Sequence, residues 1–149
     1  MERWRNTESL LKEIQEDNED QASLYFEHGL DVNMAFKDKA NHGKTPIHIA
    51  SLAGSLQVLL ALISRGSEVD PLDKDLRTPL SLAIEKNKYT CVRSLIELGA
   101  DIERKDNFGR TPLMFACKLG SKDMVELLLQ YKCDINATNN MKESCMSFA

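Results

Sequence analysis

The side chains best suited to catalysis or metal binding in this chain are four cysteines and three histidines. They are Cys91, Cys117, Cys133, Cys145, His28, His42 and His48. Successive cysteines are widely separated in the sequence, so no Cys-x-x-Cys pair occurs, and no histidine cluster accompanies them. Structural zinc sites need ligands at closer spacing. We therefore expect no metal site, and we interpret the cysteines as small apolar fillers or surface thiols.

Other catalytic signatures are missing from the sequence as well. No phosphate-binding loop of the form G-x-x-x-x-G-K-[ST] or G-x-G-x-x-G occurs, and no serine or cysteine stands in a nucleophile motif. We expect no catalytic residue and no cofactor, so the chain is not predicted to be an enzyme.

Composition narrows the remaining classes of protein. The chain has 149 residues, of which 42% are hydrophobic and 28% charged, which suits a single folded domain over residues 1–149. A net charge of −4 disfavours binding to nucleic acid. The longest apolar run, "VLLALI" at 58–63, is far too short to span a bilayer, and the N-terminus does not resemble a signal peptide. We expect a monomer without membrane contact, located in the cytoplasm or the nucleus.

A hexapeptide that occurs three times defines the elements of the fold. "TPIHIA", "TPLSLA" and "TPLMFA" begin at Thr45, Thr78 and Thr111, so they recur at a constant interval. Threonine can cap a helix and proline suits its first turn, which predicts three helix starts. Glycine, asparagine and glycine at positions 54, 87 and 120 then mark helix ends, because these residues tolerate the left-handed conformation. Apolar residues at helical spacing predict second helices within 57–63, 90–96 and 123–129.

These helix hairpins carry a family resemblance. The segments "GKTPIHIASLAGSLQVLLALISRGSEVD", "LRTPLSLAIEKNKYTCVRSLIELGADIE" and "GRTPLMFACKLGSKDMVELLLQYKCDIN" resemble the ankyrin-repeat family. The resemblance implies an all-α solenoid of stacked helix-turn-helix units, with β-hairpin-like fingers projecting between successive units. It also implies that His48 bonds the backbone of adjacent loops, and that the layers with Ser81 and Met114 lack this bond.

The repeat register divides the chain into five units. Residues 40–72, 73–105 and 106–138 are predicted as full repeats, and 10–33 as an N-terminal capping repeat. Acidic residues in the cap suit a solvated outer face, although an acidic docking patch is the alternative. They are Glu8, Glu13, Glu16, Asp17, Glu19 and Asp20. Residues 139–149 read either as a degenerate C-terminal cap or as the start of a repeat in a longer protein.

The first finger is longer than the others, because eleven positions separate Asn33 from Thr45 where the later fingers have seven. Neutral sequence drift is one explanation for the longer loop, since insertions in surface loops cost little stability. Phe36 lies in this insertion without an evident core role. It is therefore a candidate aromatic anchor for a partner.

The family geometry predicts a binding surface on the finger tips and first helices. Its candidate residues are His42, Lys44, Leu52, Asp75, Arg77, Glu85, Lys86, Phe108, Arg110, Lys118 and Leu119, together with Phe36. Leu52, Phe108 and Leu119 are the expected apolar anchors on the concave side. Lys44, Arg77 and Arg110 each precede a threonine, and this basic column serves either the repeat structure or an acidic ligand.

These features predict a noncatalytic protein–protein interaction module that binds a protein partner, whose identity the sequence does not reveal. One version is a regulator or inhibitor that occludes its partner. The alternative is the targeting or scaffold portion of a larger enzyme or signalling protein.

Overall fold

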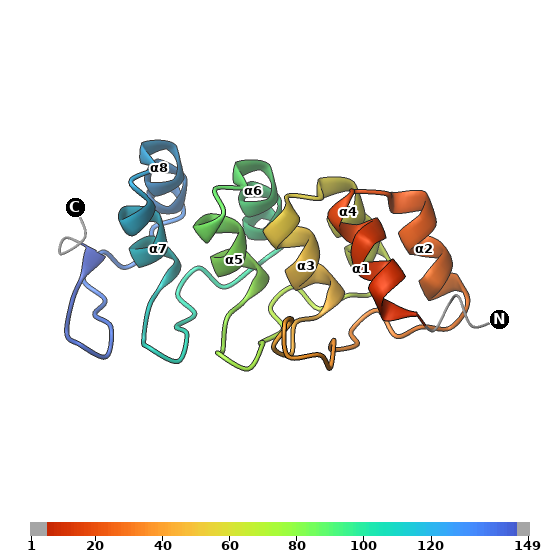
Figure 1. The fold of residues 1–149 in the computed structure, drawn as a ribbon. Coiled ribbons are helices and arrows are strands. Elements are labelled where there is room, and N and C mark those ends of the chain that lie inside the picture. Colours follow the sequence, from red (N-terminus) through yellow and green to blue (C-terminus); the bar gives the residue numbers. More distant parts are fainter. Residues whose placement is uncertain (1–5, 146–149) are drawn as a thin grey trace.

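The computed structural model describes residues 6–145, so residues 146–149 of the predicted C-terminal unit lie outside the described part. The described chain contains eight α-helices and no strand. The helices form four consecutive hairpins: α1 (Thr7–Gln15) with α2 (Glu19–Glu27), α3 (Pro46–Ala53) with α4 (Leu56–Ser64), α5 (Pro79–Glu85) with α6 (Tyr89–Glu97), and α7 (Pro112–Leu119) with α8 (Lys122–Gln130). The hairpins stand side by side in chain order, and the loops between them project along one edge (Figure 1). The predicted all-α solenoid is confirmed.

The helix starts have the predicted chemistry. The Oγ1 atoms of Thr78 and Thr111 accept hydrogen bonds from the amides of Ser81 and Met114, at 3.2 and 3.4 Å. Both amides lie in a first helical turn, where they have no partner within the helix. At Thr45 the backbone N–H donates to Nδ1 of His48 at 3.0 Å, as the N–H of Thr78 also donates to Oγ of Ser81 at 3.2 Å. Each proline occupies the first position of its helix, as predicted.

The helix ends and the layer contacts also follow the sequence prediction. Gly54, Asn87 and Gly120 have positive φ angles of 74°, 57° and 76°. The alanines that close the hexapeptides, Ala50 and Ala83 among them, are completely buried in the shared core. First helices of neighbouring repeats therefore approach closely, so a larger side chain at these positions would separate the layers.

The fingers are loops, not the β-hairpin-like strands implied by the family resemblance. The second, third and fourth fingers are nonetheless each ordered by a polar side chain at the base of the finger. Oδ1 of Asp73, of Asp106 and of Asn139 accepts hydrogen bonds from the amides two and four positions later, all at 2.9 Å. This arrangement closes a tight turn without a sheet.

Backbone hydrogen bonds join each finger to the next. The donor N–H and acceptor C=O pairs are Lys74 with His42 (3.1 Å), Asn107 with Asp75 (3.0 Å) and Asn140 with Phe108 (2.9 Å). Donors and acceptors both recur with the period of the hexapeptide, so the bond repeats along the stack. The finger row therefore has hydrogen bonds of its own in addition to the contacts of the helix core.

His48 adds a further connection, from the start of α3 to the second finger. Its Nε2 lies 2.9 Å from the carbonyl oxygen of Arg77, which confirms the bond implied by the family resemblance. At the equivalent position, Ser81 bonds only within its own repeat, to Thr78. Met114 has no side-chain N–H or O–H to donate. Among the described residues, this side-chain connection is therefore confined to the first full repeat.

The expectation that Phe36 is an exposed anchor is wrong. Its side chain is only 2% exposed and belongs to the hydrophobic core. Its amide donates to the carbonyl of Lys44 at 2.8 Å, just as Asp73 donates to Arg77 and Asp106 to Arg110 in the later fingers. Phe36 thus stands at the base of the finger, and the extra residues lie between it and Lys44. The aromatic ring fills the base where later repeats bury a carboxylate.

Candidate protein-binding surface

The three basic residues that precede the threonines all pair with carboxylates. Lys44 Nζ lies 3.3 Å from Asp73, Arg77 Nη1 lies 3.1 Å from Glu85, and Arg110 Nε lies 2.8 Å from Asp106. Asp73 and Asp106 are buried, so their charges need these partners. The structure thus gives the basic column a structural role, and its charges are largely compensated.

Arg110 is also held between two aromatic rings. Its guanidinium carbon lies 5.0 Å from the centroid of Phe108 and 4.8 Å from that of Phe115. Both distances suit cation–π attraction. The hydrogen bond from Nε to Asp106 further restrains the position of the guanidinium group. Phe108 comes from the third finger and Phe115 from α7, so Arg110 connects a finger to its first helix.

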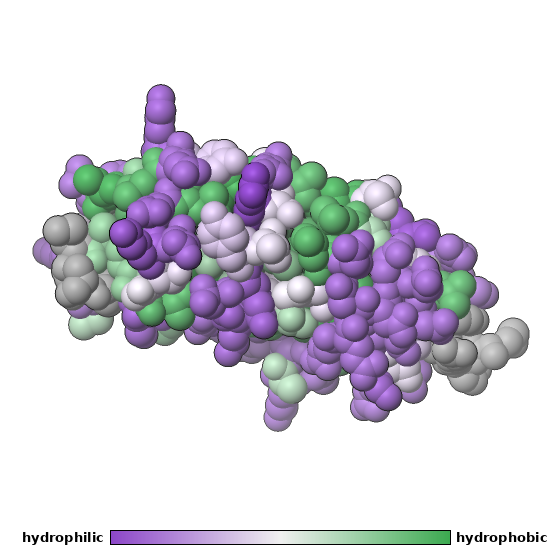
Figure 2. Space-filling model, turned by 90° about the horizontal axis from the view of Figure 1, so that it is seen from above, coloured by the Kyte–Doolittle hydropathy of each residue, from purple (hydrophilic) through white to green (hydrophobic). Residues whose placement is uncertain are grey.

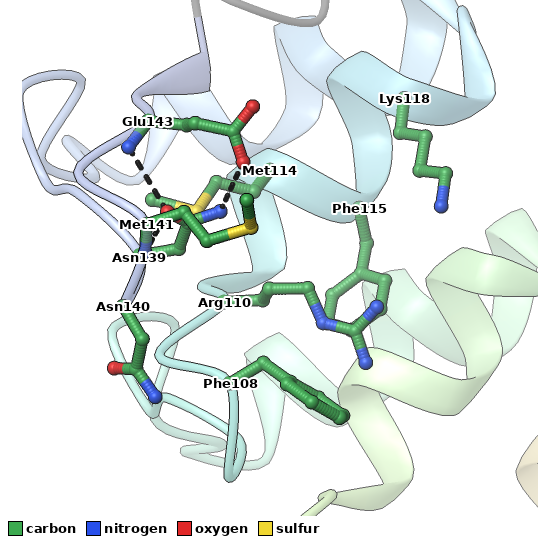
Figure 3. A pocket seen from close by; sticks show the side chains of 9 residues that line it. All are labelled: Phe108, Arg110, Met114, Phe115, Lys118, Asn139, Asn140, Met141 and Glu143. Carbon is green, nitrogen blue, oxygen red and sulfur yellow. Dashed lines mark hydrogen bonds between the residues drawn. The ribbon is translucent and has the colours of Figure 1, made fainter.

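A hollow opens beside this stack, between the third finger, the fourth finger and α7. Nine residues line it, and we call it the Phe108 hollow (Figure 3): Phe108, Arg110, Met114, Phe115, Lys118, Asn139, Asn140, Met141 and Glu143. Its volume is about 250 Å³. Phe108 is 58% exposed and Met141 is 80% exposed, so large apolar side chains meet solvent at its rim.

Gly109 permits the two fingers to approach each other here. It has a φ of +76°, and a Cβ at this position would lie 2.8 Å from the amide nitrogen of Asn140. Any side chain would therefore push the fourth finger away from the third. The spacing of the hollow walls depends on this glycine.

The other predicted surface residues are distributed along the fingers and first helices. His42 Nε2 lies 3.2 Å from Asp75 Oδ1, both half exposed, in the first and second fingers. Leu52 is half-buried on α3, whereas Glu85, Lys86, Lys118 and Leu119 are exposed near the ends of α5 and α7. A second hollow joins some of them to the first, since Glu85 and Leu119 line it together with Arg110, Phe115 and Lys118. Five of the predicted residues thus line the two adjoining hollows: Phe108, Arg110, Lys118, Leu119 and Glu85. His42, Lys44 and Leu52 line neither hollow.

Sequence reasoning missed the contribution of the fourth finger. Met141 stands one repeat period after Phe108, so the repeat register alone would have placed it at the next finger tip. Phe115 was missed for another reason. It is buried, yet one face of its ring meets Arg110, and no sequence signal separates this position from an ordinary core position.

Hydropathy differs between the two ends of the stack. Seen from above in Figure 2, hydrophilic residues predominate toward the N-terminal end, while hydrophobic patches lie toward the middle and the C-terminal end. Exposed apolar side chains at the C-terminal end include Leu119, Leu129, Ile135 and Met141. At the N-terminal end, not every acidic residue is solvated, because Asp17 Oδ1 accepts the amide of Val58 at 2.9 Å and caps α4.

Within residues 6–145, no group of three or more metal-ligating side chains is arranged to hold a metal ion. The four cysteines are free thiols, and burial raises the pKa of Cys91 and of Cys117 to about 11, which lowers their nucleophilicity near neutral pH. No helix in this part is long and apolar enough to cross a membrane.

Comparison with known proteins agrees with this architecture. The chain matches the family described as "Ankyrin repeats (3 copies)", once over residues 10–106 and again over residues 66–139. Among curated proteins, no sequence matches the chain. The two family matches together cover most of the 149 residues and include all four helix hairpins except the first turn of α1. The chain therefore belongs to the ankyrin-repeat family.

Proposed function

We propose that this protein is a noncatalytic interaction module that binds a protein partner through its fingers and first helices, centred on the Phe108 hollow. Ankyrin repeats are in general protein–protein interaction modules. The observation that carries the proposal is the exposure of Phe108 and Met141 at the rim of a hollow backed by Phe115. Exposed aromatic and Met side chains beside Arg are typical of interface centres.

Rigidity of the surface supports the same function. Phe108 is held by its amide, which donates to Asp106, and by its carbonyl, which accepts from Asn140. Arg110 is held by Asp106 and by two rings. A surface ordered before binding loses little conformational entropy on association. Occlusion of the partner's own site by this surface would make the protein a regulator or inhibitor.

A second candidate is the targeting or scaffold portion of a larger protein. A groove of about 500 Å³ on the C-terminal side of α7 and α8 favours it, because Leu113, Val125, Leu129 and Ile135 line that groove. Val92 and Ile96, the equivalents of Val125 and Leu129 one repeat earlier, are buried in the shared core. A further repeat packed on this groove would continue the stack. An open reading frame that continues past Ala149 into a catalytic domain would support this candidate over the regulator.

Partner capture with two matched leucine variants tests the proposed function. Leu119 on α7 and Leu60 on α4 are exposed to a similar extent, 39% and 41%, and only Leu119 lies beside the hollows. Purified wild-type protein, Leu119→Ala and Leu60→Ala are each used as bait, and captured proteins are quantified by mass spectrometry. We expect Leu119→Ala to lose a partner that wild type and Leu60→Ala retain. Equal capture by all three, or loss only with Leu60→Ala, would contradict the assigned surface.

A further inference from the structure

The charges around the Phe108 hollow are unequally compensated. Glu143, the carboxylate of its lining, accepts a hydrogen bond from Asn139 Nδ2 at 3.0 Å, while its amide donates to Asn139 Oδ1 at 2.9 Å (Figure 3). Glu85, the carboxylate of the adjoining hollow, pairs with Arg77. Both carboxylates therefore have hydrogen-bond partners, but only Glu85 is paired with a cation, since Asn139 is neutral.

The two cations that line both hollows, Arg110 and Lys118, differ from these carboxylates. Arg110 bonds Asp106 through Nε, and neither terminal amino group of its guanidinium has a hydrogen-bond partner among residues 6–145. Lys118 is exposed, and its Nζ has no carboxylate within ion-pair distance in this described part of the chain. The Arg110–Asp106 pair is neutral as a whole, so Lys118 supplies the uncompensated positive charge.

Lys118 and Arg110 line both hollows, and Phe115 lies between their side chains (Figure 3). An anionic group at the edge of Phe115, between Lys118 and the free edge of Arg110, would thus meet an ammonium group and free guanidinium N–H donors. Charged hydrogen bonds of this kind are stronger than neutral ones. Because the chain as a whole carries a net charge of −4, this attraction is local and selects for the position of a charge rather than for an acidic partner in general.

The apolar part of the hollow sets the second requirement. Phe108, Met114 and Met141 form walls around about 250 Å³, which is below the roughly 300–1,000 Å³ of typical small-molecule pockets. The space accommodates one large side chain rather than a cofactor. Methionine is adaptable in shape, so Met141 suits more than one apolar side chain.

We infer that the Phe108 hollow binds a peptide segment of the partner in which a large apolar side chain is followed or preceded closely by Asp or Glu. The apolar side chain enters between Phe108 and Met141, and the carboxylate binds Lys118 and the free edge of Arg110. This inference rests on the proposed function and specifies the kind of segment that the same surface recognises.

Selection from a phage-displayed random peptide library on the full chain tests the inference. We expect enriched peptides to carry Leu, Ile, Met, Phe or Trp within about two positions of Asp or Glu, as two adjacent subsites require. The best peptide is then synthesised, and its affinity is measured by fluorescence polarisation. A version with Gln or Asn in place of the acidic residue is measured beside it.

Charge variants then locate the contact. Lys118→Gln removes the proposed cation, and Lys122→Gln is the matched control, because Lys122 is an exposed lysine at the start of α8 whose side chain is absent from both hollows. We expect Lys118→Gln to weaken binding by about three- to tenfold and to abolish the preference for the acidic peptide. Lys122→Gln should leave both unchanged. Met141→Ser, altered at a side chain that is mostly exposed, should weaken both peptide versions equally.

Three outcomes would overturn the inference. They are enrichment of no peptide, enrichment of peptides without the apolar–acidic pair, or equal effects of Lys118→Gln and Lys122→Gln. The proposed function is judged separately, by the matched leucine variants in partner capture. Leu119→Ala could lose the partner while the peptides show none of the expected preferences. That result would support the proposed interaction surface and contradict the inferred apolar–acidic segment.

Discussion

His48 Nε2 lies 2.9 Å from the carbonyl oxygen of Arg77, in the next finger along the chain, while its Nδ1 accepts the amide of Thr45. These two bonds require the neutral imidazole with its proton on Nε2. The imidazole therefore connects the start of α3 to the second finger. Burial is the largest cause that lowers the pKa of His48 from its usual 6.5, because a charged ring is poorly solvated in the core.

His48→Gln should lower the free energy of unfolding by about 1–3 kcal/mol near pH 7.5, because a flexible side chain replaces the rigid ring that bonds the Thr45 amide and the Arg77 carbonyl at once. The lowered pKa also predicts a pH effect. Above pH 6.5 the wild-type ring is neutral in both states, and below it the unfolded state binds the proton more readily. Wild-type stability should thus fall below that pH more steeply than that of His48→Gln. Chemical denaturation at about pH 7.5 and about pH 5 measures both proteins. A constant difference between them would contradict the buried neutral histidine.

Phe36→Ala should destabilise the fold by about 3–5 kcal/mol, because it removes a fully buried ring from the base of the first finger. Urea denaturation measures the change, and Phe36→Leu, which keeps most of the volume, should cost clearly less. A change within about 0.5 kcal/mol for Phe36→Ala would mean that the ring is exposed in solution.

Leu76→Gly should stabilise the protein by about 0.5–1 kcal/mol, because a side chain is strained at positive φ. Leu76 has a φ of +60° at the finger position where the first and third fingers have Gly43 and Gly109, also at positive φ. The side chain of Leu76 is 44% exposed, so little packing is lost. Thermal or urea denaturation measures the gain. Leu76→Ala serves as the control, since alanine keeps the strain and should not stabilise; a gain with alanine and none with glycine would refute the explanation.

Cys117 should react slowly with iodoacetamide in the folded protein near pH 8. Burial raises its pKa from 9.0 to about 11, and the neighbouring thiols Cys145 and Cys133 add to the effect, so less thiolate is present at a given pH. Mass spectrometry of the peptide that contains Cys117 measures the rate. We expect modification more than about tenfold slower than in urea-unfolded protein, with the rate still rising above about pH 9. A rate equal to that of the unfolded chain would exclude the raised pKa.

The repeat architecture could be predicted from the sequence because the residues that start and end each helix act locally. Threonine, proline and glycine act through their own backbone, and their recurrence at a constant interval sets the register. His48 could be assigned its bond from the family resemblance. The finger conformation could not be predicted to this level, because side-chain bonds from Asp73 and its equivalents replace the strand pairing that the family implies.

The candidate surface was only partly predictable. Phe108, Arg110, Lys118 and Leu119 were expected at the surface and do lie together, but Phe36 was placed wrongly because the position of an insertion within a loop leaves no mark in the sequence. Phe115 and Met141 depend on which side chains meet across two fingers and a helix. Such contacts are set by packing between repeats, not by the residues of any single repeat.

The proposed interaction surface is tested most directly by measuring affinity for the captured partner and folding stability together, for wild type and Phe108→Ala. Phe108 is 58% exposed, so its truncation should leave the free energy of unfolding within about 0.5 kcal/mol. Calorimetric titration should show affinity lowered by about 1–2 kcal/mol or more, because an aromatic anchor and one face of the Arg110 stack are lost. Unchanged affinity with unchanged stability would show that the partner binds another face, and a large loss of stability would show that Phe108 belongs to the core.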